Sequence, residues 1–227
     1  MRENTINKLQ KAYDFFNQGL YKQAEILYLG VLDKLDKEDL ELYKQALHGL
    51  GYVKIELDQY QEATEMFLQL LSLAEQEGNN EEKAIAYHQL GMAERKARNY
   101  ERAMTYFDEE IAIYDTSSPD FHLGYAAAYY EYGTVFMLQD DLETAKEYLE
   151  KSVSHAERTD DLVLLGYAYR NLGDVYQAMD EGQKALVFYQ SALESLHRGD
   201  SPQAAEDVKS RMVGVLQDLE NGKSTLN

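Results

Sequence analysis

Residues 172–189, LGDVYQAMDEGQKALVFY, decide the fold, because Gly173, Ala185 and Tyr189 are spaced by twelve and then four residues. The same pattern occurs three more times, at intervals of 40 or 42 residues, while its inner spacing never changes. These three copies are Gly51, Ala63 and Phe67; Gly91, Ala103 and Phe107; and Gly133, Ala145 and Leu149. A weaker copy, with alanine in place of the glycine, precedes them at Ala12, Ala24 and Tyr28. Insertions therefore fall between units, which is typical of a repeat array whose units pack on their neighbours.

Each repeat is predicted to be two antiparallel helices. In the last repeat, Leu165, Tyr169, Leu172 and Tyr176 are spaced by four, three and four residues, which indicates one face of a helix over 162–178. After a break at 179–182, a second helix is expected over 183–196. The pattern predicts an all-α fold.

The recurring glycine predicts a close contact between the two helices of a repeat. A glycine inside a helix costs about 1 kcal/mol relative to alanine, so its repetition at one phase implies a compensating gain. We expect the alanine twelve residues later to be the opposing small residue. The large residue four positions further on would fill the remaining space.

A single domain over 1–222 is expected, followed by a frayed tail at 223–227. Ser118-Pro119 and Ser201-Pro202 each place a capping hydroxyl before a first-turn proline, which marks helix starts. Asn80 and Asp160-Asp161 are further caps on the same grounds. The predicted repeats cover about 5–36, 40–77, 80–116, 118–158 and 160–198, with a capping helix over 202–220.

The composition excludes several classes of function. The net charge is −19, from 22 basic and 41 acidic residues, which argues against binding nucleic acid or an anionic membrane. Cysteine is absent, no long apolar run occurs, and the N-terminal residues lack the apolar core of a signal peptide, so a cytoplasmic protein is expected. Because no nucleophile, zinc or phosphate-loop motif is present, we expect no enzyme, catalytic residue, cofactor or metal site.

At these positions the chain resembles the tetratricopeptide repeat (TPR) family. The last repeat matches best, and the resemblance covers about residues 5–220. Its matching residues are Tyr169, Leu172, Gly173, Tyr176, Ala185, Tyr189 and Ala192. The departures are Tyr132, Ser152, Lys54 and Glu94, and a period of about 40 residues rather than 34. Such long repeats are similar to those of kinesin light chains, LGN-type adaptors and bacterial Rap/PlcR-type receptors, although no output domain is expected here.

The resemblance implies a right-handed α-solenoid of five helix hairpins plus a C-terminal capping helix. It also implies that the first helices line a concave, partner-binding groove. The groove positions are His48, Tyr52, His88, Gln89, Met92, Arg95, Lys96, Tyr130, Glu131, Thr134, Tyr167, Arg170, Asn171 and Asp174.

Asn171 is singled out among these positions. In peptide-binding relatives an asparagine at this place holds the ligand backbone; the alternative is a solvated surface amide. The carboxylate clamp that binds acidic chaperone tails is not expected, because Gln10, Gly49, Gln89 and Glu131 occupy the equivalent positions.

A second candidate surface is the stretch 103–145, which is rich in acids and tyrosines and, between its end residues, holds no Lys or Arg. It would suit a basic or aromatic partner segment, or it is a solvated acidic face over an aromatic core.

We therefore expect a non-catalytic adaptor or scaffold that binds another protein or peptide. The alternatives are a peptide sensor that changes shape on binding and a self-assembling structural protein. Either a monomer or a homodimer is compatible with the sequence.

Overall fold

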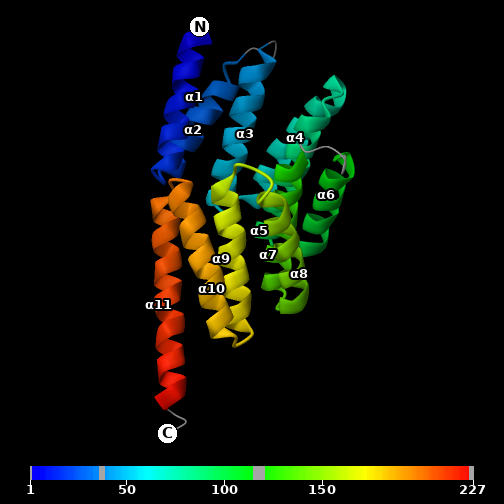
Figure 1. The fold of residues 1–227 in the computed structure, drawn as a ribbon. Helices are drawn as coiled ribbons and strands as arrows, with labels where there is room; N and C mark the ends of the chain where they lie inside the picture. Colours follow the sequence, from blue (N-terminus) through cyan, green and yellow to red (C-terminus); the bar gives the residue numbers. More distant parts are fainter. Residues whose placement is uncertain (1, 36–38, 115–120, 225–227) are drawn as a thin grey trace. The chain divides into compact units, whose positions relative to one another are not determined.

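The computed structural model describes residues 2–35, 39–114 and 121–224, so the predicted Ser118-Pro119 cap lies outside the described residues (Figure 1). Within these ranges the chain forms eleven helices and no strand, which confirms the all-α prediction. The chain divides into two compact units, unit 1 (Met1–Ile113) and unit 2 (Tyr114–Asn227). In the described ranges, no helix is both long enough and apolar enough to cross a membrane.

Unit 1 consists of three helix pairs. Each helix packs against the next along the chain, and α1 also contacts α3. The helices are α1 (Arg2–Asn17), α2 (Tyr21–Leu32), α3 (Leu40–Glu56), α4 (Tyr60–Glu77), α5 (Asn80–Lys96) and α6 (Tyr100–Ile113).

Unit 2 consists of two helix pairs and a final helix, and α9 and α10 lie side by side as a hairpin (Figure 1). The helices are α7 (His122–Leu138), α8 (Leu142–Ala156), α9 (Leu162–Ala178), α10 (Gly182–Arg198) and α11 (Pro202–Ser224). The predicted bounds of α9 are confirmed. Helix α11 starts at Pro202 as predicted but continues past 220, so residues 223 and 224 of the predicted tail are helical. The last three residues lie outside the described part.

The recurring glycines provide the predicted close contact. A Cβ built on Gly173 would lie 2.5 Å from the Tyr189 ring, and the other three glycines meet the large residue of their own repeat as closely. The pairs are Gly51–Phe67, Gly91–Phe107, Gly133–Leu149 and Gly173–Tyr189. The nearest atoms belong to the large side chain in each pair, and at Gly133 the carbonyl oxygen of Ala145 also lies 3.2 Å from the built Cβ. The four alanines are fully buried, and their role as the opposing small residue stays a prediction.

The turn between the two helices of each pair has one recurring geometry. A residue with positive φ stands at the same phase in every pair of the described chain: Gly19, Asp58, Arg98, Asp140 and Asp180. Glycine and aspartate tolerate this left-handed conformation, whereas an arginine is unusual in it. Three helix starts of the described chain have a side-chain cap. Helix α5 is capped by Asn79 and not by the predicted Asn80, and α8 is capped by Asp141. Asp161 caps α9 as predicted.

The departures from the family pattern in unit 1 are buried charges. Lys54 is 6% exposed, and its ammonium group bonds to Glu25 at 2.7 Å and to Glu62. Glu94, at the same phase one repeat later, is 3% exposed, accepts from Asn99 at 2.8 Å and pairs with Arg102 at 3.2 Å. The two positions therefore carry opposite charges, each held by its own partners.

At this phase unit 2 carries aromatic residues. Phe136 stacks on Tyr148 and Tyr176 stacks on Phe188, with ring centroids 5.4 and 5.0 Å apart. Ser152, which replaces the second alanine, is fully buried and donates to the carbonyl oxygen of Ala126 at 2.7 Å. The polar groups of Lys54, Glu94 and Ser152 thus each have a hydrogen-bond or ion-pair partner on a neighbouring helix or turn.

Candidate functional site

Among the described residues of unit 1, two neighbouring cavities lie along its first helices. The α1–α3 cavity has a volume of about 500 Å³ and is lined by residues of α1, α2 and α3. The α3–α5 cavity has a volume of about 230 Å³ and is lined by residues of α3, α4 and α5. Gln45 and His48 line both, so the cavities adjoin along one side of α3.

Gln89 is the most unusual residue of the α3–α5 cavity. It is 2% exposed, and neither its side-chain oxygen nor its side-chain nitrogen has a hydrogen-bond partner among the described residues. A buried amide that bonds to no other group costs about 1–3 kcal/mol, the free energy of taking its polar atoms out of water. Such a group in a native structure needs an explanation, and Gln89 stands in the wall of a cavity, where a ligand would reach it.

The other walls of the α3–α5 cavity are partly apolar. Leu70, Ile85 and Ala86 line it beside Gln89. His48 lies between this cavity and the next, and its ring packs edge-on against Tyr52, with centroids 5.1 Å apart. Burial lowers the pKa of His48 below its ordinary value of 6.5, so the ring is neutral at pH 7.

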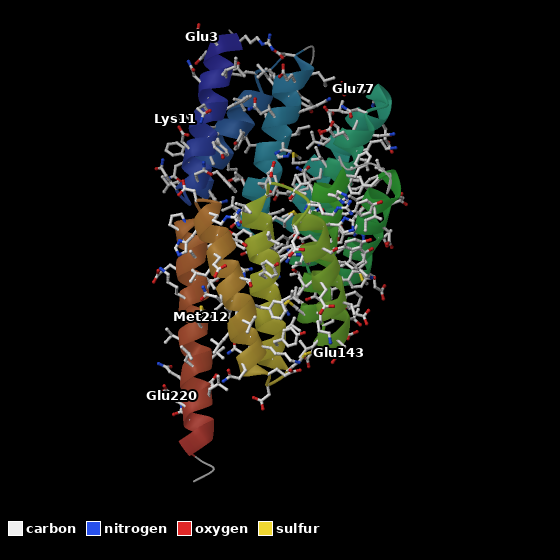
Figure 2. All side chains as sticks on the ribbon, in the orientation of Figure 1. Glu3, Lys11, Glu77, Glu143, Met212 and Glu220 are labelled. Carbon is white, nitrogen blue, oxygen red and sulfur yellow. The ribbon has the colours of Figure 1, made fainter. Side chains whose placement is uncertain are left out.

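The rim of the α3–α5 cavity carries an unequal set of charges. Lys44 of α3 and Glu82 of α5 line the cavity and pair with each other at 2.6 Å. Lys44 also pairs with Glu77, which does not line the cavity itself but lies beside it at the C-terminal end of α4 (Figure 2). Burial opposes the charge of Lys44, but hydrogen bonds from the ammonium to the two carboxylates raise its pKa above the ordinary value. One cation faces two anions, so the rim has a net negative charge.

In unit 2 the equivalent first-helix positions are occupied by a connected polar network. Asn171 is 4% exposed; its oxygen accepts from Arg170 at 3.0 Å and its nitrogen donates to Thr134 at 3.2 Å. Arg170 also donates to the Tyr130 hydroxyl and lies over the Tyr167 ring. Asn171 is therefore not a solvated surface amide, and that interpretation is wrong.

Helix α11 extends this network. Arg211 pairs with Asp174 of α9 at 2.8 Å and with Asp207 at 2.9 Å. The Tyr189 hydroxyl donates to Asp174 at 2.6 Å, and burial together with that carboxylate raises the pKa of Tyr189. The polar groups of these positions thus have partners within unit 2.

The remaining predicted groove residues belong neither to the cavities of unit 1 nor to the polar network of unit 2. His88 pairs with the buried carboxylate of Glu110 on α6, at 2.9 Å. Glu131 is buried at the α7 position equivalent to Gln89. Three more lie toward the C-terminal end of α5: Met92, Arg95 and Lys96.

The acidic, tyrosine-rich stretch 103–145 is only partly described, since 115–120 lie outside the described residues. Within unit 2, Tyr125 and Tyr132 are buried in the core. Tyr129 packs against Tyr148, and Lys151 lies over both rings. Part of the tyrosine set is therefore structural, as its phase predicts.

Sequence reasoning missed the charged rim of the α3–α5 cavity. Lys44, Glu77 and Glu82 lie at helix ends, where charged residues are common and carry little signal. These three residues are recognised as a group only in the structure, where ion pairs join their side chains from three helices. Among the described residues, no cluster of three or more His, Cys, Asp or Glu side chains could hold a metal ion.

Comparisons with known proteins agree with the fold. The model of a family described as tetratricopeptide repeat matches residues 44–116 and 124–196, which together exceed half of the chain. No curated protein matches the sequence.

Solved structures show the same fold at low sequence identity. A thermophilic TPR protein from Thermus thermophilus is 21% identical, with a TM-score of 0.63, and the match covers 94% of this chain and 99% of that one. The apo form of RapI is 12% identical, with a TM-score of 0.63, over 96% and 85% of the chains. BtubC from P. vanneervenii is 22% identical, with a TM-score of 0.59, over 89% and 78%.

Proposed function

Since the chain belongs to the tetratricopeptide repeat family, we propose that it is a non-catalytic adaptor that binds a peptide segment of a partner protein along the first helices of unit 1. Proteins of this family generally mediate protein–protein interaction. The observation that carries the proposal is the pair of adjoining cavities on α1, α3 and α5, one of which contains a buried amide without a partner among the described residues.

The composition of the two cavities suits a peptide. Ligand sites are mostly apolar and contain a few polar groups that fix orientation. The α1–α3 cavity is lined by Leu9, Tyr13 and Phe16, and the α3–α5 cavity by Leu70 and Ile85, with Gln45 and His48 between them. A segment lying across α3 would bury apolar side chains on both sides of that helix and keep its backbone near these polar groups.

Unit 1 is favoured over Asn171 and its neighbours in unit 2. Asn171, Arg170 and Asp174 already have partners within their own unit, so a ligand would have to break those bonds to use these groups. Gln89 has no hydrogen bond to another described residue that it would give up when a ligand binds. The first helices of unit 1 therefore offer the more favourable binding surface.

A blocking substitution tests this placement. Gln45 is exposed and lines both cavities, so the indole of Gln45→Trp should fill the space that a peptide needs. Peptides selected from a displayed random library on the full chain would be measured by fluorescence anisotropy. We expect at least a tenfold loss of affinity in Gln45→Trp.

The matched control is Gln61→Trp, which places the same residue on an exposed position of α4 away from both cavities. It should leave the affinity unchanged, and thermal unfolding should show that both variants are folded. Equal affinity of the two variants, or a library that yields no binder, would contradict the proposal.

A further inference from the structure

We propose that the α3–α5 cavity recognises a peptide residue with an apolar side chain that is directly followed or preceded by Lys or Arg. In this arrangement Gln89 bonds to the backbone amide of the apolar residue, and Glu77 and Glu82 bind the basic neighbour. The inference rests on the proposed function and names the chemistry of its partner.

Gln89 determines what kind of polar group the cavity takes. A side-chain amide has an acceptor oxygen and a donor nitrogen, and both lack a partner among the described residues. A charged ligand group would leave one of the two unpaired, whereas another amide satisfies both. Every peptide backbone carries such a group, so the cavity complements a backbone amide without requiring a particular side chain there.

The volume of the cavity sets the size of the side chain. About 230 Å³ is larger than the roughly 150 Å³ of an engineered protein cavity that binds benzene, so one large apolar side chain fits. Leu70, Ile85 and Ala86 form an apolar lining for it. Ile85 is 46% exposed, which leaves apolar surface that a ligand would cover.

The rim determines the charge of the neighbouring residue. Lys44 is shared by Glu77 and Glu82, so one negative charge remains uncompensated within this group. Both carboxylates are over a third exposed, which keeps them accessible from solvent. A Lys or Arg beside the apolar residue would supply the missing positive charge, whereas Asp or Glu would be repelled.

A positional-scanning library of N-acetylated, C-amidated hexapeptides tests the charge preference on the full chain. We expect enrichment of an apolar residue at one position and of Lys or Arg at an adjacent one. The variant Glu77→Gln/Glu82→Gln leaves Lys44 as the uncompensated charge, so the adjacent preference should reverse toward Asp or Glu. The control Glu143→Gln/Glu147→Gln, on exposed positions of α8, should keep the wild-type preference.

The role of Gln89 is tested with the hexapeptides that the library selects. Gln89→Met removes the amide at similar volume and should weaken binding about tenfold, as expected for the loss of one or two hydrogen bonds. N-methylation of the apolar residue should weaken binding to the wild type similarly but add nothing in Gln89→Met. Gln217→Met, at an exposed position of α11, should change neither affinity.

The outcomes separate this inference from the proposed function. Hexapeptides that Gln45→Trp fails to bind, but that show no basic preference or bind Gln89→Met as tightly as the wild type, would overturn the inference and leave the proposed function standing. If the wild type selects no hexapeptide, both fail. Reversal of the charge preference together with non-additive loss at Gln89 supports the inference.

Discussion

The first helices of unit 1 and those of unit 2 place amide side chains at equivalent positions but leave them in opposite states. Among the described residues, Gln89 is buried without a partner, whereas Asn171 is buried with both its oxygen and its nitrogen bonded. The two residues differ by 82 positions, which is two repeats. Repeat position alone therefore does not distinguish a binding group from a structural one.

The neighbours of the two amides explain the difference. Asn171 bonds to Arg170, the preceding residue, and to Thr134 of the preceding repeat. The residues at those places around Gln89 are His88 and Tyr52. His88 is turned toward Glu110, and Tyr52 packs on His48 and Phe67. Within the described chain, Gln89 therefore has no partner in reach while Asn171 has two.

The largest effect is expected from substitutions in the glycine contact, which both units contain. Gly91→Leu and Gly173→Leu should each lower the free energy of unfolding by about 1–3 kcal/mol or more, because even a Cβ would lie within 2.2–2.5 Å of a ring. Chemical denaturation would measure both losses.

Two glycines provide the control for these variants. A Cβ on Gly30 or Gly214 meets nothing within 4 Å, so alanine there should stabilise by up to about 1 kcal/mol. An unchanged midpoint in Gly91→Leu or Gly173→Leu would show that the glycine contact is not part of a common frame.

The second largest effect is expected from removing the hydrogen-bonded amide of Asn171. Asn171→Leu should destabilise unit 2 by about 1–3 kcal/mol, because it removes two hydrogen bonds and leaves the half-buried polar groups of Arg170 and Thr134 with fewer partners. Thermal and denaturant unfolding would measure the loss. A variant as stable as the wild type would mean that the network contributes no stability, and the contrast between the units would lose its energetic basis.

The third substitution should raise the free energy of unfolding, whereas the first two lower it. Gln89→Met removes a buried amide that bonds to nothing in the described structure, so we expect unit 1 to gain up to about 1 kcal/mol. The same unfolding measurements apply. Destabilisation of Gln89→Met comparable to that of Asn171→Leu would show that Gln89 has a structural partner, and the distinction between the two amides would disappear.

The smallest effect concerns one partly buried histidine in each unit, His48 and His155. Burial lowers the pKa of His48, and burial together with His122 and Arg158 lowers that of His155. The unfolded chain then binds protons first as the pH falls below about 6.5, so this stability is complete above that pH and is lost below it. His48→Gln and His155→Gln should each flatten the decline in unfolding free energy between about pH 7.5 and 5.5.

The two histidines should differ in binding. A peptide in the α3–α5 cavity would exclude more water from His48, so binding should weaken as the pH falls, and His48→Gln should reduce this dependence. His155→Gln should leave it unchanged. An equal response of peptide binding to both substitutions would contradict the assignment of the cavity.

The helical frame could be predicted because its signals are local. The glycine at a fixed distance from a large residue predicts a contact that the structure contains, and the spacing of Leu165, Tyr169, Leu172 and Tyr176 gives the bounds of α9. Such features depend on residues of one helix or one hairpin.

The candidate site was only partly accessible from the sequence. The repeat phase predicts His48 and Gln89 as groove positions. The unpartnered state of Gln89 in the described chain and the network of Asn171 depend instead on which side chains of neighbouring helices reach them. Both are properties of helix packing. Lys44, Glu77 and Glu82 come from three different helices, so no short pattern joins them.

The buried charges of unit 1 bear on how the chain avoids stacking its repeats out of register. Repeats with the same glycine and ring positions could pair with the wrong neighbour during folding, since every hairpin offers the same steric fit. Lys54 and Glu94 stand at one phase in successive hairpins with opposite charges, and their partners Glu25, Glu62 and Arg102 are correspondingly opposite. If the α5–α6 hairpin packed on α2 in place of the α3–α4 hairpin, Glu94 would meet Glu25, two like charges largely removed from water, which costs roughly several kcal/mol. The exchange of an aromatic ring for a charge thus distinguishes the α3–α4 hairpin from the α5–α6 hairpin, and the order of these two hairpins on α2 is specified by charge as well as by shape.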